Sequence, residues 1–326
     1  MLSIRAASLA ALSVIVASAF APDAFAHCFV GARFLPATLT VDDPCVSDEL
    51  SLPTVTAFGT GDDPSSSQVD ISAEYSKRIT PTLGVSIGAA LSQITPPGMP
   101  TVSGFQNLET TVKWQFATVP QHELVISLGL GIEWSGTGAQ IVGAETFNTY
   151  TPTLWFGKGF GDLPDSVGWL RPFAITGQIG YAIPGVAATA TVDPDTGDVG
   201  ADYHAQVLRW GGTLQYSMPY LNSNVIDLGL PEFFNQLNLI VEGQFQTPVG
   251  YTLTSGTLTT GTISPGLIWT GSYFQVGVEA LIPINRQSGS GVGIIAQVHF
   301  YLDDIFPRTI GKPLFGSSTS RQAMGY

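Results

Sequence analysis

Charged side chains are scarce in this sequence. They make up 11% of the 326 residues, whereas about 25% is usual for soluble globular proteins. Lys and Arg together number only 12, against 25 Asp and Glu, which gives a formal net charge of −13. Proteins that bind nucleic acids neutralise phosphates with Lys and Arg side chains, so this composition excludes a nucleic-acid partner. It also disfavours an ordinary soluble domain.

Long hydrophobic runs are also missing after the N-terminus. The mean hydropathy is positive, at +0.25, yet no later stretch reaches the about 18 apolar residues that a membrane-spanning helix needs. At the N-terminus, Arg5 precedes an apolar stretch over residues 6–21 and the triplet Ala24-Phe25-Ala26. This pattern is typical of a secretory signal peptide. We predict a signal peptide over residues 1–26, cleaved after Ala26, and disfavour an uncleaved anchor helix because the apolar stretch is short.

Cysteine is nearly absent, and the pair that exists is informative. Cys28 and Cys45 are the only two cysteines, and both follow the predicted cleavage site. An even number of cysteines in an exported chain favours a disulfide formed in an oxidising compartment. We therefore predict a Cys28–Cys45 bridge, with two free thiols as the alternative.

Alternation of apolar and polar residues is the abundant feature. In the stretch 107–116, NLETTVKWQF, Val112 and Trp114 fall on one side of an extended chain, and Glu109 and Lys113 fall on the other. Period two indicates β-strands, and strands of about ten residues suit a membrane crossing better than the shorter strands of globular proteins. The same alternation returns at residues 68–76, 83–91, 123–134, 173–183, 208–218, 237–246, 274–282 and 292–302, with weaker candidates at 52–61, 147–160 and 260–269.

The connections between these segments alternate between mostly short and mostly long, and aromatic residues cluster near segment ends. Both features are typical of bacterial outer-membrane barrels, which place short turns in the periplasm. Lipid forbids an open sheet edge, so the sheet must close. We predict an all-β protein: a closed antiparallel transmembrane β-barrel of about twelve strands, in the outer membrane of a Gram-negative bacterium. A soluble β-sandwich is the less favoured alternative.

The predicted barrel covers residues 52–306 and leaves two flanking segments. Residues 27–51 precede the first strand, and we expect them to plug the lumen from the periplasmic side or to lie beneath it. Residues 307–326 form a predicted periplasmic tail. The acidic stretch 193–198, DPDTGD, favours an ordinary turn over a Ca²⁺ site, because it lacks the length and closing Glu of an EF-hand.

Three stretches resemble segments of a known family. SGFQNLETTVKWQF, GDLPDSVGWLRPFAITGQIGYAIP and HFYLDDIFPRTIGKPLF are similar to bacterial outer-membrane proteins labelled as transporters of the MetA pathway of phenol degradation. The resemblance covers most of the mature chain loosely and includes no catalytic motif. It implies a transporter or channel for small molecules, aromatic or otherwise hydrophobic. The N-terminal HCFVGARFLPATLTVDDPC is a departure from the family, and no functional residue carries over.

The predicted function is therefore passive diffusion of a small molecule through the barrel. The expected partners are outer-membrane lipid, the small-molecule substrate and the barrel-assembly machinery. The alternatives are a structural or adhesive barrel with a filled lumen and, less favoured, a barrel hydrolase. We expect no enzyme, cofactor or metal site, since the sequence contains no G-x-S-x-G, H-E-x-x-H or phosphate-binding loop.

The alternation of inward and outward side chains along each strand (its parity) predicts which residues line the lumen. Glu242 and Glu279 should lie at similar depth, on strands separated by one other strand. Both should point into the lumen, because a charged side chain at that depth faces lipid only at a cost of a few kcal/mol. They are then either solvated in a conducting pore or paired with Arg209 and Lys113. His299 also points inward, and we interpret it as a satisfied single histidine. The predicted lumen residues are Glu74, Lys113, Glu133, Arg209, Glu242, Glu279 and His299.

Overall fold

The computed structural model describes residues 28–192 and 197–316. The predicted signal peptide, its cleavage site and the end of the C-terminal tail lie outside the described residues, as do residues 193–196 of the stretch 193–198. Within the described ranges, no helix is long and apolar enough to cross a membrane.

Twelve long strands form a closed antiparallel barrel, as predicted. Each strand pairs with the next along the chain, and the last strand pairs with the first, so the sheet has no open edge between them. A short thirteenth strand, β6 (Val102–Phe105), pairs only with β5. The barrel strands are β3 (Glu49–Gly59), β4 (Ser67–Thr80), β5 (Leu83–Thr95), β7 (Leu108–Val119), β8 (Leu124–Trp134), β9 (Thr149–Gly159), β10 (Phe173–Pro184), β13 (Gln206–Ser217), β14 (Leu237–Gly250), β15 (Thr260–Thr270), β16 (Phe274–Pro283) and β17 (Gly293–Tyr301).

The boundaries differ slightly from the predicted ones. The first barrel strand begins at Glu49 instead of residue 52, because its pairing with β17 already starts opposite Tyr301. The last strand ends at Tyr301, and the chain continues as the short helix α4 (Leu302–Ile305). The predicted barrel range thus begins inside the first strand and ends beyond the last.

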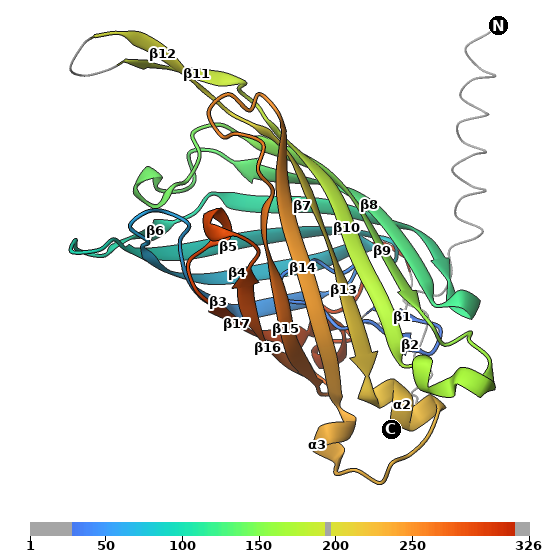
Figure 1. Cartoon of the computed structure of the whole chain (residues 1–326). Coiled ribbons are helices and arrows are strands. Elements are labelled where there is room, and N and C mark those ends of the chain that lie inside the picture. Colours follow the sequence, from blue (N-terminus) through green and yellow to red (C-terminus); the bar gives the residue numbers. More distant parts are fainter. Residues whose placement is uncertain (1–27, 193–196, 317–326) are drawn as a thin grey trace, which may run out of the picture.

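The two ends of the barrel carry different structures. At the long-loop end, β11 (Ala188–Val192) and β12 (Val199–Tyr203) form a hairpin that projects beyond the barrel (Figure 1), and η2 (Gln140–Val142) and η4 (Arg286–Ser288) lie in other loops. The opposite, short-turn end carries η1 (Pro120–His122), η3 (Asp165–Leu170), α2 (Met218–Asn224) and α3 (Glu232–Asn235).

The outward face of the barrel is apolar, as the alternation predicts. Trp114 is 52% exposed and Val112 is 48% exposed, whereas the intervening Lys113 is half-buried and points inward. Aromatic rings pair across neighbouring strands: Phe173 packs against Tyr216 at 4.8 Å and Trp210 against Phe245 at 4.4 Å between ring centroids. Such a surface is suited to lipid, with aromatic residues toward its two rims.

The N-terminal segment, residues 28–48, lies inside the wall of strands at the short-turn end. It contains a small hairpin, β1 (Phe29–Val30) and β2 (Arg33–Phe34), which Figure 1 shows at the end of the barrel that carries α2. The Cys28–Cys45 disulfide is present, which confirms the predicted bridge. Inward glycines make room for the segment, since a Cβ atom at Gly277 would come within 2.5 Å of Leu39 Cδ1.

Candidate functional site

The lumen is the candidate functional site, and Glu242 holds the N-terminal segment within it. The Glu242 carboxylate accepts hydrogen bonds from the backbone N–H groups of Leu39 (3.2 Å), Thr40 (2.7 Å) and Val41 (2.9 Å), and from the Thr40 hydroxyl. The side chain is fully buried. Charge-assisted hydrogen bonds of this kind are stronger than neutral ones, and they offset the cost of burying the carboxylate.

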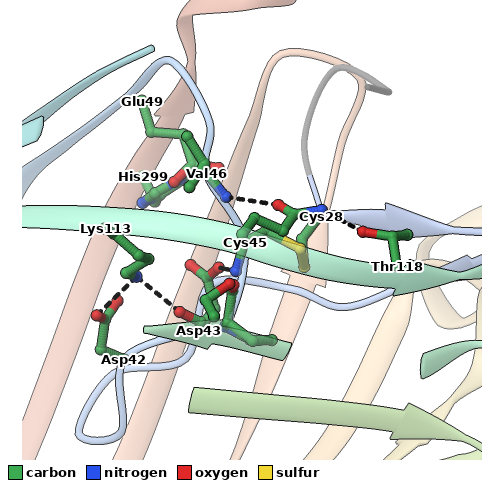
Figure 2. Close-up of a disulfide and its surroundings, with 12 residues drawn as sticks. Cys28, Asp42, Asp43, Cys45, Val46, Glu49, Lys113, Thr118 and His299 are labelled. Atoms are coloured by element: carbon green, nitrogen blue, oxygen red, sulfur yellow. Dashed lines mark hydrogen bonds and ion pairs between the residues drawn. A yellow bond between two sulfur atoms is a disulfide. The ribbon is translucent and has the colours of Figure 1, made fainter. Parts of the chain in front are cut away.

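This arrangement differs from both alternatives that the sequence offered for Glu242. The carboxylate is neither solvated nor paired with Arg209 or Lys113. Lys113 instead donates to Asp42 Oδ2 (2.8 Å) and to the backbone oxygen of Asp43 (2.7 Å), as Figure 2 shows. The physical reason is that the N-terminal segment enters the lumen and supplies nearer partners for both residues.

Asp43 lies beside the disulfide, where Figure 2 shows it between Lys113 and Cys45. Its Oδ1 atom accepts a hydrogen bond from the Cys45 N–H group at 2.8 Å. Burial raises the pKa of Asp43 to about 7, and nearby Glu49 and Asp42 also raise it, while Lys113 opposes them. Asp43 is therefore a titratable group near neutral pH within the segment.

Arg33 anchors the segment at the short-turn end. The guanidinium is fully buried; Nε lies 3.1 Å from Glu123 Oε2, and Nη1 donates to the Pro172 oxygen at 3.0 Å. Its Cζ atom lies 3.7 Å above the centroid of the Tyr220 ring. Burial, followed by the charge of Glu123, raises the pKa of Tyr220 to about 12. The segment is thus tied to a turn and to helix α2 as well as to the barrel wall.

Glu279 lies near Glu242 but has a different environment. The two residues lie on β16 and β14, with β15 between them, where Glu242 is opposite Ser264 and Glu279 is opposite Gly266. Glu279 is 1% exposed, and among the described residues neither carboxylate oxygen has a hydrogen-bond partner. Its inward direction and the outward exposure of Val278 follow the predicted parity.

Two cavities remain in the lumen beside the segment. The inner cavity, of about 330 Å³, lies against the N-terminal segment and includes Glu74, Lys113 and His299 in its lining. The outer cavity, of about 170 Å³, lies toward the long loops and includes Glu133 and Arg209. Both linings contain Glu109 and Thr111, so the cavities are neighbours at β7. One lies in the long-loop half of the lumen and the other against the segment.

The outer cavity has the more neutral lining. Besides Glu109, Glu133 and Arg209, threonine and glutamine side chains dominate it, and the Trp155 ring borders it. Glu133 accepts a hydrogen bond from Asn107 Nδ2 at 3.0 Å. Arg209 Nε is buried without a hydrogen-bond partner among the described residues. The predicted lumen residues thus divide into an outer pair, an inner group of three, and the two glutamates of β14 and β16.

His299 has neighbours that the sequence reasoning missed. The Ser51 hydroxyl lies 2.8 Å from His299 Nδ1, and Glu49 Oε2 lies 3.3 Å from His299 Nε2. All three residues line the inner cavity. The interpretation of His299 as a single histidine considered no neighbouring strand, whereas Ser51 comes from β3, which pairs with β17 in register. Cross-strand pairing of the first and last strands was the signal that could have found it.

Asp42, Asp43 and Arg33 were also missed, because their segment shows no strand periodicity. The available signal was glycine at inward parity: at Gly157 a Cβ atom would come within 2.7 Å of Leu35 Cδ1. Inward glycines on a wall otherwise lined by longer polar side chains indicate that another piece of backbone approaches closely.

Comparisons with known proteins support the fold. No protein-family profile matches the chain, and a search of curated proteins finds no match. Among solved structures, an outer-membrane channel from Pseudomonas putida F1 is similar with a TM-score of 0.50 and 9% identity, over 82% of this chain and 99% of that one. The NanC porin (TM-score 0.44, 9% identity, 76% and 98% covered) and the KdgM porin (0.42, 10%, 76% and 98%) are also similar. At these identities the likeness shows the barrel fold, and it does not test the phenol-degradation label.

Proposed function

We propose that the protein is a channel of the bacterial outer membrane whose N-terminal segment restricts the periplasmic half of the lumen. The apolar outward face suits lipid, and the short-turn end, which carries both ends of the described chain, faces the periplasm as in other barrels of this kind. Membrane lipid and the barrel-assembly machinery are then its partners. The observation that carries the proposal is the pair of neighbouring polar cavities in the lumen, the inner of which lies against a segment held by Glu242.

The solute that these cavities favour is small and polar. The family resemblance implies an aromatic or hydrophobic solute, but the linings contain mostly carboxylates, amides and hydroxyls, beside the outer cavity's three aromatic residues, Trp155, Trp210 and Phe245. Polar groups left without partners by an apolar solute would weaken its binding. We therefore favour polar solutes over the aromatic ones.

Planar-bilayer recording of the refolded full-length mature chain tests the channel. We expect small ionic conductance that fluctuates between levels as the segment moves, and faster permeation of polar solutes than of phenol in liposome assays. Fractionation of cells should place the protein in the outer membrane. Absence of conductance, even after removal of the segment, would instead favour the structural or adhesive barrel with a filled lumen.

A second candidate function is favoured by one observation, the Ser51–His299–Glu49 arrangement. A nucleophile, a base and an orienting carboxylate in hydrogen-bond reach are the parts of a serine hydrolase site. In that role Ser51 Oγ would attack an ester carbonyl carbon, His299 would take the hydroxyl proton and pass it to the leaving alcohol, and water would then release the acid from Ser51. Labelling of Ser51 by a fluorophosphonate, lost in Ser51→Ala and His299→Gln, would support it; an unlabelled wild-type protein would exclude it.

A further inference from the structure

The inner cavity holds more negative charge than its own basic residues neutralise. Five carboxylates line it: Asp42, Asp43, Glu49, Glu74 and Glu109. Lys113 and His299 are the basic side chains of the lining, and each is already engaged. Lys113 is bound to Asp42, and His299 lies against Glu49.

Three carboxylates remain without an ion pair among the described residues: Asp43, Glu74 and Glu109. The Asp43 side chain accepts a backbone N–H group, and Glu74 accepts only a long 3.4 Å hydrogen bond from the Ser76 hydroxyl. Asp43 is buried, whereas Glu74 and Glu109 are exposed to the interior of the lumen, and like charges gathered around one cavity repel one another. A positive charge placed between them would relieve this repulsion.

Gln297 provides an independent indication of what kind of positive charge fits. It is 8% exposed and lines the same cavity. Its Nε2 group donates to Thr54 Oγ1 at 3.0 Å, whereas its Oε1 atom is buried and, among the described residues, has no hydrogen-bond partner. A buried acceptor without a donor is costly, so an N–H group of a bound molecule would stabilise this atom.

A bare metal ion fits this cavity poorly. In the described part of the chain, the only three close metal-ligating atoms come from Cys28, Asp43 and Cys45, and the two sulfurs are bonded to each other. The volume of about 330 Å³ also far exceeds the roughly 10–15 Å³ that a single water-sized occupant needs. The occupant that meets these conditions is larger, cationic and rich in N–H groups.

We propose that the inner cavity binds a small organic cation with N–H donors, of the primary ammonium or diammonium class. The carboxylates of Glu74 and Glu109 would attract its charge, and Gln297 Oε1 would accept one of its N–H groups. This inference rests on the proposed channel, because the solute reaches the cavity through the lumen, and it names the solute class that the cavity selects.

Isothermal titration calorimetry on the refolded full-length mature chain in detergent tests the site with 1,4-diaminobutane as the probe. Tetramethylammonium, which has charge without N–H donors, and glucose, which has donors without charge, are the comparison ligands. We expect 1,4-diaminobutane to bind about tenfold or more tightly than either, as one charge-assisted hydrogen bond implies. Equal affinities for the two cations, or no binding of 1,4-diaminobutane, would overturn the proposal.

Two variants locate the site. Glu74→Gln should weaken 1,4-diaminobutane binding about tenfold, whereas the matched Glu133→Gln in the outer cavity should leave the affinity unchanged. Should Glu74→Gln fail to fold, as judged by heat-dependent gel mobility, Gln297→Leu tests the same cavity by removing the free acceptor. Affinity unchanged in a folded Glu74→Gln or Gln297→Leu protein would contradict the proposal.

The same titration separates this inference from the channel proposal, because calorimetry requires no conduction. Binding in a protein that does not conduct would reject the channel and keep the cation site. Conduction without binding, and without preference for ammonium ions over chloride, would keep the channel and reject the site.

Discussion

The two halves of the lumen are filled in different ways. In the long-loop half, side chains of the wall surround the outer cavity, and Arg209 Nε has no hydrogen-bond partner among the described residues. In the short-turn half, a second piece of chain enters and binds the wall through Glu242, Lys113 and Arg33. The barrel has the same strands in both halves, so its diameter alone does not decide how much space remains for a solute.

The halves therefore differ in how their contents are attached. Wall side chains in the long-loop half are carried by strands that are paired on both sides. The N-terminal segment pairs with no barrel strand in the described residues; hydrogen bonds from side chains, the Arg33 and Lys113 ion pairs and packing hold it. Because no strand pairing ties the described residues of the segment to the wall, we expect that the segment can leave while the barrel stays intact.

Removal of the segment should have the largest effect. Deleting residues 28–45, which removes both cysteines together, should raise single-channel conductance several-fold and abolish the fluctuation between levels, because the short-turn half then fills with water. The matched control deletes residues 188–203 in the long-loop half, replaced by a short Gly-Ser linker, and should change conductance little. If the control deletion opened the channel more than the first, the constriction would lie in the long loops.

Loss of the disulfide should have the next largest effect. The bridge joins residues 17 apart in sequence, and on the chain-entropy model a loop of this length contributes about 3 kcal/mol by restricting the released segment. The double variant Cys28→Ser/Cys45→Ser should therefore release the segment more often. Trypsin measures this release, because Arg33 is fully buried in the docked segment and cleavage there follows the released population.

The control for this measurement is within the same molecule. Arg286 lies in the long-loop half with a side chain that is 58% exposed, so its cleavage rate should be the same in both proteins. An Arg33 cleavage rate unchanged by the double substitution would show that the disulfide does not restrict the released segment.

Glu242→Gln should have a smaller effect of the same kind. The amide keeps one acceptor oxygen but loses the charge, and its NH₂ group faces N–H donors of the segment. Hydrogen bonds to charged groups contribute about 1.5–3 kcal/mol, so we expect about 2 kcal/mol less stable docking and faster cleavage at Arg33. Glu133→Gln is the matched control in the long-loop half, where we expect no change at Arg33. Equal rates for the two variants would contradict the holding role of Glu242.

The barrel could be predicted from the sequence because neighbouring residues of a strand face lipid and lumen in turn, which require apolar and polar side chains respectively. Val241 and Glu242 could be assigned to opposite faces from their order alone, and the structure agrees. What each inward residue contacts could not be predicted in this way. Thr40 and Glu242 are 202 positions apart, and Ser51 and His299 are 248 apart. Such contacts depend on where the chain enters the barrel and how the sheet closes, which periodicity does not report.

The N-terminal segment shows the limit most clearly. Its sequence has no period, so plugging the lumen and lying beneath it were equally consistent with the residues. The pairing of Lys113 with a lumen glutamate was a reasonable expectation for an empty barrel, and it was wrong because Asp42 reaches Lys113 first. The alternation along each strand identifies which side chains face the lumen. Predicting what those side chains contact also requires the position of the N-terminal segment.

Over a single pH unit, a change of pH should have the smallest effect, and it acts through Asp43. Docking raises its pKa to about 7 from 3.8, so between these values the docked segment binds a proton that the released segment has lost. Docking is therefore strongest below about pH 4 and weakens as pH rises to about 7, by at most tenfold per unit, or about 1.4 kcal/mol.

The variant Asp43→Asn tests this pH dependence, because it keeps the acceptor for the Cys45 N–H group and does not titrate. A control at Asp43 itself is needed, since Asp42, Glu49 and Lys113 face the same carboxyl group and also set its pKa. The open fraction in bilayer recordings should increase from pH 5.5 to 6.5 in the wild-type protein and increase less in Asp43→Asn. An equal increase in both proteins would assign the pH dependence to another group and would show that protonation of Asp43 does not control docking of the segment.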